Sequence, residues 1–493
     1  MKQYLKVQSD RKKYHLNPLK NTVHRSSLLA PTMKGAETSI TFINHFLIKR
    51  NYKSVALKIS AIDQHGNLID SNTSEVFEKR VYTLNLTKMF SKDKVKNFLV
   101  EFFSDKNLFV PFPAVIVSHS GKDFCNVVHS FNRILNDVFE NDQINYENVA
   151  ESSIDVINNE KFDTFFNLAS GMKDINGFLN IAYEKENKKF SKKIKVSLPR
   201  LSFKSFYLSK ILPKKSEGGT IKIEQPKPEF FFGRMLAGRI NKKTGAFSAN
   251  HSFYDSSKTK EYFNSKLSFR TYPFFKDFSN KVVFYPIISK CDLDIKIDIK
   301  DKKNNFSSKN YKFKSNSKTP LEIDISEIVK KNNLKNLNAF TVTAHSSKGK
   351  VPTRINHQLI YGGQEKNHSL DCSINVSLTN DTVFTPKNKK SFVWGSALAN
   401  KNYKSNIGFC FKKNGGLEEE VEIDFYSEKE MLISKKFNLK PSEAKTFNIK
   451  DLIDLNENFQ YVWYVAKSLR PDLNAYSVHK HNVSENSSGE HNF

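Results

Sequence analysis

The chain has 493 residues, of which 38% are hydrophobic and 13% aromatic, and this length is too great for a single hydrophobic core. We expect three to five globular domains joined by polar linkers, and the apolar content excludes a chain that is disordered throughout. The formal net charge is +27, but only 11 of the 78 basic residues are Arg. This excess of Lys argues against a surface that reads bases or phosphates through bidentate contacts.

The cysteines and the N-terminal segment indicate the cellular compartment in which the protein is expected. Four cysteines lie far apart in the sequence and form no CxxC pair, which argues against a disulfide framework or a zinc knuckle. The first twenty residues, MKQYLKVQSDRKKYHLNPLK, are basic and contain no apolar run, unlike a secretory signal. No segment approaches the length of a transmembrane helix. A cytoplasmic protein is therefore the default expectation.

Along the chain, one pattern of alternating apolar residues followed by a short apolar end occurs four times. It is typical of a strand that runs into a single helical turn covering the edge of a β-sandwich. The four segments are VYTLNLTKMF, SFKSFYLSKIL, PLEIDISEIV and KTFNIKDLI, which end at Phe90, Leu212, Val329 and Ile453. Their ends are 122, 117 and 124 residues apart, which indicates an internal repeat.

A short motif, His followed at the second position by Leu or Phe, returns at a similar interval. The positions are His15, His129, His251, His368 and His491, with separations of 114, 122, 117 and 123 residues. We interpret these histidines as residues of the junctions between repeats, where they pack against a neighbouring module or contact a ligand. A second alignment, based on the preceding hairpins, places His129 opposite His357 and leaves its equivalence with the other four open.

These features predict an all-β protein, a tandem array of four immunoglobulin-like antiparallel β-sandwich repeats of about 120 residues. A basic tail and a lead-in strand occupy residues 1–36. The predicted repeats span 37–158, 159–262, 263–385 and 386–493. The main helical candidate is CNVVHSFNRILNDVFEND, at Cys125–Asp142, because its apolar spacing also suits a helix. In CDLDIKIDIKD, at Cys291–Asp301, strict alternation predicts a half-buried strand.

The segment GRMLAGRINKKTG, at Gly233–Gly245, contains two arginines within a glycine-spaced stretch. It lacks the GK[ST] ending of a P-loop and a helix to receive a phosphate. We expect a hairpin here. Arg234 and Arg239 are candidate anion-binding residues on it.

The richest group of metal-ligand side chains is in YSVHKHNVSENSSGEHNF, near the end of the chain. His479 and His481 share one face if the segment is a strand, so they can offer two imidazoles to one metal ion. The spacing His-x-His-x3-Glu, from His479 to Glu485, resembles the first metal motif of the cupin family over seven positions. This resemblance implies one divalent metal ion, held by His479, His481 and Glu485, with His491 as the further ligand. The alternative is a polar strand without a metal.

The sequence contains no motif for a nucleophile or a cofactor loop, so we expect a protein that is not an enzyme and has no cofactor. The favoured function is a tandem-repeat binding or scaffold protein whose sandwich faces and junction loops meet a polymer, a glycan or a protein. A metal-dependent enzyme with its site in the last repeat is one alternative. A nonspecific nucleic-acid or polyanion binder is another, which the scarcity of Arg disfavours.

Overall fold

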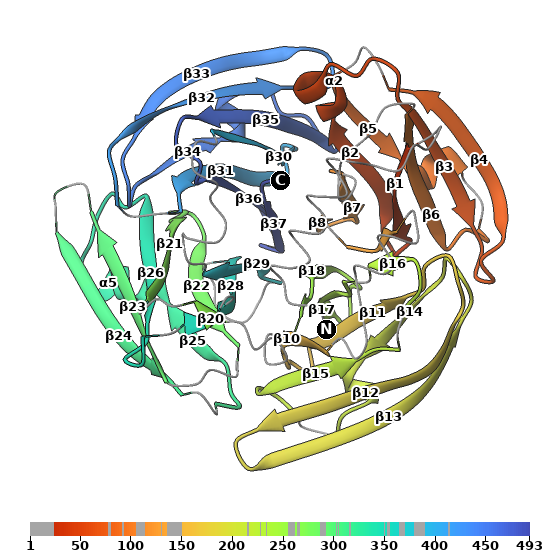
Figure 1. Cartoon of the computed structure of the whole chain (residues 1–493), viewed down its shortest axis with the longest axis horizontal. Coiled ribbons are helices and arrows are strands. Elements are labelled where there is room, and N and C mark those ends of the chain that lie inside the picture. The colour runs from red at the N-terminus through yellow and green to blue at the C-terminus, as the bar shows by residue number, and fades with distance from the viewer. Residues whose placement is uncertain are drawn as a thin grey trace. The chain divides into compact units, whose positions relative to one another are not determined.

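The computed structural model of the chain consists almost entirely of β-strands in antiparallel sheets (Figure 1). The prediction of an all-β protein is therefore confirmed. The structure describes residues 24–76, 80–90, 93–104, 114–129, 131–135, 150–213, 216–226, 228–232, 234–254, 262–263, 267–285, 292–301, 303, 305–314, 317–349, 351–352, 355–363, 370–378, 390–412 and 415–493. Two of the predicted junction histidines, His15 and His368, lie outside these residues.

The chain divides into two compact units, Met1–Thr259 and Lys260–Phe493. Each unit contains two sets of eight strands, and we call these sets copies one to four in chain order. Copies one and two belong to the first unit, and copies three and four belong to the second.

The strands of the first unit have the following bounds. Copy one comprises β1 (His24–Pro31), β2 (Glu37–Ile43), β3 (Ala56–Ile62), β4 (Leu68–Glu75), β5 (Val81–Asn85), β6 (Asn97–Ser104), β7 (Ile116–Ser120) and β8 (Cys125–Val128). Copy two comprises β10 (Ala150–Asp155), β11 (Phe162–Ala169), β12 (Ile175–Lys185), β13 (Lys188–Leu198), β14 (Phe203–Tyr207), β15 (Thr220–Glu224), β17 (Leu236–Asn241) and β18 (Phe247–His251). Additional short elements are α2 (His45–Arg50), β9 (Arg133–Ile134), β16 (Phe231–Phe232) and β19 (Phe253–Tyr254).

The strands of the second unit have the following bounds. Copy three comprises β21 (Leu267–Pro273), β22 (Ser279–Phe284), β23 (Leu293–Lys300), β24 (Phe306–Phe313), β25 (Leu321–Asp324), β26 (Ala339–His345), β28 (Ile355–Gly362) and β29 (Cys372–Leu378). Copy four comprises β30 (Ser391–Ala399), β31 (Tyr403–Phe411), β32 (Glu419–Tyr426), β33 (Met431–Leu439), β34 (Ala444–Asn448), β35 (Gln460–Ser468), β36 (Leu473–His481) and β37 (Ser487–His491). A further short pair is β20 (Tyr262–Phe263) with β27 (Val351–Pro352).

The same strand order occurs in all four copies. The first, sixth, third and fourth strands form one sheet, and the fifth, second, seventh and eighth strands form the other. We name them the fourth-strand sheet and the eighth-strand sheet, after the strand that lies at an edge of each. In immunoglobulin domains the first strand pairs with the second and the seventh with the sixth. Here the first strand pairs with the sixth and the seventh with the second, so the copies have a different strand order from that fold.

The two sheets of a copy enclose its hydrophobic core. In copy two, one cluster joins Phe166 of the eighth-strand sheet to Ile181 and Ile223 of the fourth-strand sheet. In copy one, the rings of Phe42 and Phe102 meet edge to face across the sheets, with centroids 5.1 Å apart. Each copy is therefore a two-layered antiparallel sandwich.

The fifth strand of each copy runs into a short helix at the place where the sequence predicts a single helical turn, and in copy three this helix has seven residues. The turns are α3 (Leu86–Phe90), η1 (Leu208–Lys210), α5 (Ile325–Lys331) and η3 (Ile449–Asp451). The first residue of every turn is an apolar side chain with 0% exposure. In copies three and four the turn begins with a side-chain cap, since Asp324 accepts a hydrogen bond from the Glu327 amide and Asn448 from the Lys450 amide.

The prediction of a half-buried strand at Cys291–Asp301 is confirmed by β23. Its residues alternate between buried and accessible from Leu293 to Lys300, and Leu293, Ile295, Ile297 and Ile299 enter the core of copy three. The charged residues lie on the accessible face of this strand, where Lys296 forms an ion pair of 3.0 Å with Asp298.

The helix predicted at Cys125–Asp142 is wrong where the structure describes it. Cys125–Val128 is the strand β8, and all four of its side chains are buried. A short, continuously buried strand has no alternation to separate it from a buried helix. Residues 136–142 lie outside the described part of the chain.

The first strands of copies one and two begin earlier than the predicted repeats. β1 precedes residue 37 and pairs with β6, and β10 precedes residue 159 and pairs with β15.

Among the described residues, no helix has both the length and the apolar character needed to cross a membrane.

Candidate functional site

Each copy has an equivalent position at its eighth strand. The pairing register locates this position by counting across the sheet from the last residue of the fifth strand. In copy four, Asn448 next to the helical turn lies opposite Asn406. Two residues further on, Gly408 lies opposite Tyr476, which in turn lies opposite His491. The equivalent residues in copies one, two, three and four are His129, His251, Asn375 and His491.

The register decides between the two alignments that the sequence allowed. His129 directly follows β8, whose Val128 lies opposite Val117, so His129 is level with Ile116 at the recurring position. His357 lies on the seventh strand of copy three, and its alignment with His129 is wrong. In copy three the recurring position holds Asn375, seven residues after the predicted His368.

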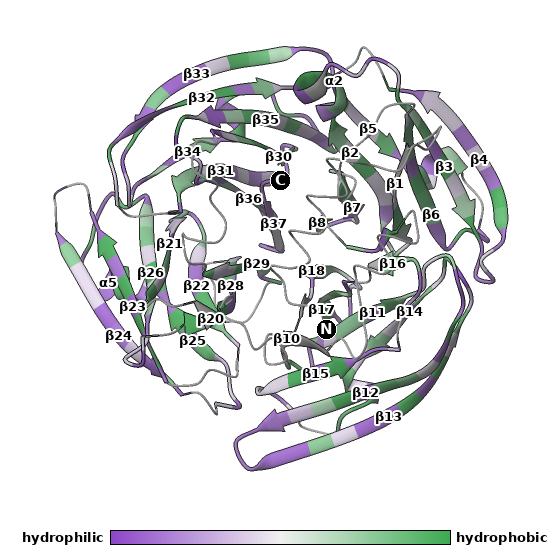
Figure 2. Cartoon of the chain, viewed as in Figure 1, coloured by the Kyte–Doolittle hydropathy of each residue, from purple (hydrophilic) through white to green (hydrophobic). Residues whose placement is uncertain are grey.

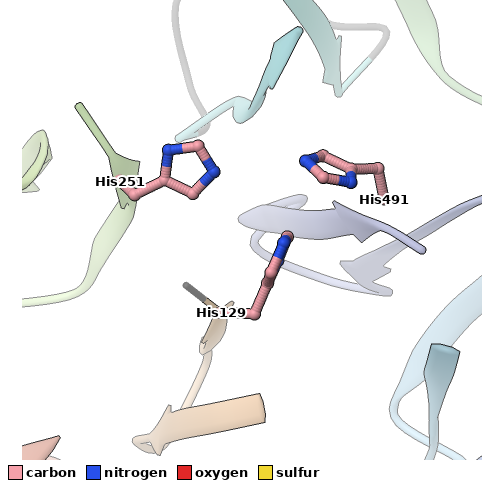
Figure 3. A group of neighbouring side chains, drawn as sticks. All are labelled: His129, His251 and His491. Atoms are coloured by element: carbon pink, nitrogen blue, oxygen red, sulfur yellow. The ribbon is translucent and has the colours of Figure 1, made fainter. Parts of the chain in front are cut away.

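His129 and His251 meet where copies one and two of the first unit adjoin. Their ring centroids are 5.6 Å apart with perpendicular planes (Figure 3), and both residues are buried. The Nδ1 atom of His251 lies 3.3 Å from the Ser252 carbonyl oxygen and 3.4 Å from an Arg234 guanidinium nitrogen. Burial lowers the pKa of His129 to about 3, and the charge of Arg234 acts in the same direction. His129 is therefore neutral at pH 7, which suits packing between modules.

The two candidate anion-binding arginines have different surroundings. The segment that contains them is a hairpin of β17 and β18, as predicted. Arg239 lies on β17 opposite Ser248, whereas Arg234 precedes the strand and reaches His251. A cation so close to His251 disfavours a second cation, such as a metal ion, at these two imidazoles.

The candidate metal ligands of copy four lie on two faces of one sheet. His479 and His481 both point toward the ring of Tyr403, with centroids 5.7 and 5.1 Å away. His491 pairs with Tyr476, three residues from His479. Because cross-strand partners share a face and neighbours along a strand alternate, His491 lies on the face opposite His479 and His481.

Two of these residues also have protein partners of their own. Nδ1 of His481 accepts a hydrogen bond from the Ser484 amide at 3.1 Å. Glu485 accepts one from Lys480 at 2.8 Å. The ion pair with Lys480 offsets the negative charge of the Glu485 carboxylate, which disfavours its use as a metal ligand.

In the first unit, the eighth strands of copies one and two lie against each other. The Ala249 amide of β18 donates a hydrogen bond of 2.7 Å to the Asn126 side-chain oxygen of β8. The ring of Phe247 contacts His119 and Phe124 of copy one, at centroid distances of 5.6 and 5.1 Å. The sequence pointed to the histidine position but not to these three partners, because nothing in the local pattern marks a strand edge as an interface.

In the second unit, the same two edges meet through different groups. The Ser487 amide of β37 donates to the Leu370 carbonyl oxygen at 2.8 Å, and the Ser487 hydroxyl accepts from the Cys372 amide at 3.0 Å. Tyr476 and Val478 of copy four enter the core of copy three. The two copies therefore share buried surface as well as hydrogen bonds.

A partly buried arginine adds to this junction in the second unit. The Arg270 guanidinium carbon lies 5.7 Å from the Tyr272 ring centroid and 6.0 Å from that of Tyr476. Arg270 also donates a hydrogen bond of 3.0 Å to the Ser377 carbonyl oxygen. A guanidinium held between the rings of two copies stabilises their contact.

The fourth strands are the exposed edges of the copies. In β4, β13, β24 and β33 the outward residues are accessible, and most of β4 and β13 is hydrophilic (Figure 2). The outward side chains differ from copy to copy although the strand order is the same. The four copies therefore share one strand order but have different exposed side chains on their fourth strands.

No known protein family matches the sequence, and no curated protein matches it either. Among solved structures, the chain is similar to a tetra-tandem repeat in the extending region of a large adhesion protein, with 9% identity, 95% of this chain and 99% of that one covered, and a TM-score of 0.10. It is also similar to the FN1–FN3 domains of chicken CNTN1, with 8% identity, 70% of this chain and 96% of that one covered, and a TM-score of 0.09. Such TM-scores are too low to support a shared function.

Proposed function

We propose that the chain is a non-enzymatic binding or scaffold protein, made of four tandem β-sandwich repeats of about 120 residues, that presents its exposed sheet faces to a polymer, a glycan or a protein. The observation that supports this is the fourfold strand order with an exposed fourth strand in every copy. A constant frame with variable outward residues is suited to recognition.

The placement of the histidines supports the same proposal. His119 approaches the Pro31 carbonyl oxygen within 2.9 Å, and burial lowers its pKa to about 4. Nε2 of His357 lies 2.6 Å from the Tyr272 hydroxyl, and burial lowers the pKa of His357 to about 3. Buried imidazoles of this kind pack the interior of the sandwich, and their placement supports a binding or scaffold role.

The second candidate is a metal-dependent enzyme, which the shared face of His479 and His481 favours. Elemental analysis of the full chain and of His481→Ala separates the two functions. We expect no stoichiometric metal in either protein, and unchanged retention of both on a panel of immobilised polysaccharides. One equivalent of metal that is lost in His481→Ala would favour the enzyme.

A further inference from the structure

We propose that the fourth-strand sheet of copy two binds an acidic polysaccharide on the outward face of β12 and β13, which we call the basic face. This inference rests on the proposed binding function and names the chemistry of the ligand. The basic face comprises Asn176, Phe178 and Asn180 of β12 with Lys189, Lys193, Lys195 and Ser197 of β13. Two carboxylates share this side of the sheet, since Glu184 of β12 lies opposite Lys189 and Glu224 of β15 lies opposite Asn180.

The strand period separates the outward residues from the core. Phe190 and Ile194 of β13 pack on the core of copy two, so the alternate residues Lys189, Lys193 and Lys195 point away from it. All three lysines are exposed. Lys189 lies opposite Glu184, whereas Lys193 and Lys195 lie opposite the uncharged Asn180 and Phe178, so the positive charge along this edge strand is concentrated at Lys193 and Lys195.

An exposed aromatic ring lies beside this row. Phe178 of β12 pairs with Lys195 and keeps 47% of its surface accessible. The ammonium group of Lys193 lies 4.0 Å from the centre of the ring. A large exposed apolar side chain is informative when polar and charged groups surround it. The exposed part of the ring offers an apolar contact to the C–H groups of a sugar, and the lysine over the ring can meet a carboxylate or a sulfate.

Polar groups for sugar hydroxyls flank the ring on both sides along the strand. Asn180 pairs with Lys193 on one side. On the other, the Ser197 hydroxyl donates a hydrogen bond of 2.7 Å to the Asn176 side-chain oxygen. Amides and hydroxyls next to an aromatic ring supply the directional contacts that a polyhydroxylated ligand needs.

The equivalent sheet of copy four shows that this charge is not a consequence of the fold. There the outward residues of β32 include Glu420 and Glu422, and Lys436 of β33 lies 3.7 Å from a carboxylate oxygen of each. On the basic face, Lys193 and Lys195 lie opposite Asn180 and Phe178. Charge complementarity therefore points to an anionic ligand for copy two.

A polysaccharide fits this face better than a nucleic acid. The basic face contains lysines and no arginine, so it offers point charges and not the planar forks that grip phosphates bidentately. The Lys193 ammonium group already covers the Phe178 ring, the surface on which a base would have to stack. Carboxylate or sulfate groups along a sugar chain can meet such point charges one at a time.

The test measures binding of the full chain to heparin, to polygalacturonate, to an uncharged dextran and to a single-stranded oligonucleotide over a series of salt concentrations. The first variant is K193E together with K195E, and the matched control is K312E together with K436E, which makes the same charge change on β24 and β33. The second variant, Phe178→Ser, removes the ring and keeps the charge.

We expect the wild type to bind heparin or polygalacturonate, and K193E/K195E to lose about tenfold in affinity with a shallower salt dependence. Phe178→Ser should lose several-fold at an unchanged salt slope, and K312E/K436E should bind as the wild type does. Equal losses in both double variants, no binding of either acidic polysaccharide, or tighter binding of the oligonucleotide would overturn the inference. Binding of dextran that no variant affects would also overturn it, but would leave the proposed binding function in place.

Discussion

The junction of copies one and two and the junction of copies three and four use the same strand edges with different chemistry. In the first unit, the eighth strands meet through the Asn126 side chain and an aromatic group around Phe247. In the second, they meet through Ser487 and through Tyr476, whose ring lies near the Arg270 guanidinium. The same edges therefore pair in both units, although the side chains that join them are different.

The largest expected effect is at Tyr476, which has 0% exposure and belongs to the shared core of copies three and four. Tyr476→Ala should lower the free energy of unfolding by about 4 kcal/mol, because it leaves a cavity and removes the ring beside Arg270. Urea unfolding followed by tryptophan fluorescence measures this, since both tryptophans, Trp394 and Trp463, lie in copy four.

Tyr476→Phe is the matched control for this substitution. It keeps the ring and removes only the hydroxyl, which accepts a hydrogen bond of 2.6 Å from the Asn474 side chain. We expect a loss of about 1 kcal/mol. If Ala and Phe at this position gave equal losses, the ring would not hold the two copies together.

Acid should destabilise both units, and the first unit more steeply. The pKa is lowered to about 3 for His129 and about 4 for His119 in the first unit, and to about 3 for His357 in the second. Below pH 6.5, a histidine whose pKa is lowered in the folded chain takes up a proton on unfolding. Its contribution to the free energy of unfolding is therefore fully present above pH 6.5 and is lost as the pH falls toward the pKa of the folded state. Each such group costs about 1.4 kcal/mol per pH unit in this window.

Unfolding at pH 7 and pH 5, followed separately for the two units by hydrogen exchange, measures this difference. His129→Gln should weaken the pH dependence of the first unit and leave that of the second unchanged. Equal slopes in the two units, or no change in His129→Gln, would contradict the assignment of the buried neutral imidazole.

The sequence revealed the repeated unit because its signals are local. The apolar plug after the fifth strand, at Leu86 and its three equivalents, follows from strand alternation and a short helical turn. The spacing of the histidines is also a local signal. In copy three, however, the motif selects His368, whereas Asn375 occupies the equivalent position in the structure. The sequence alone cannot choose between these two polar residues, which lie seven positions apart, because the choice depends on how the strands pair.

The strand order and the junction partners could not be predicted from local patterns. Periodicity shows that a segment is a strand but not which strand it pairs with, and the immunoglobulin order was inferred from strand number and spacing alone. The partnership of Asn126 with the Ala249 amide joins residues 123 positions apart. A buried strand such as β8, without alternation, also looked like a helix.

The smallest expected effect is at Asn126. Asn126→Ala removes the acceptor of the Ala249 amide and should lower the free energy of unfolding of the first unit by about 1 kcal/mol, the net value of one hydrogen bond. Asn180→Ala, on the exposed face of β12, is the control and should change it by less than about 0.5 kcal/mol. Equal effects would mean that the eighth strands of the first unit do not depend on this bond.

Hydrogen exchange at the edges of the sheets tests most directly that paired copies meet through their eighth strands. The Ala249 and Ser487 amides point away from their own sheets, and each donates to the neighbouring copy of its unit. We predict that β18 and β37 are protected far longer than the outward amides of the exposed edge strands β13 and β33. Exchange of β18 and β37 as fast as that of β13 and β33 would contradict the account.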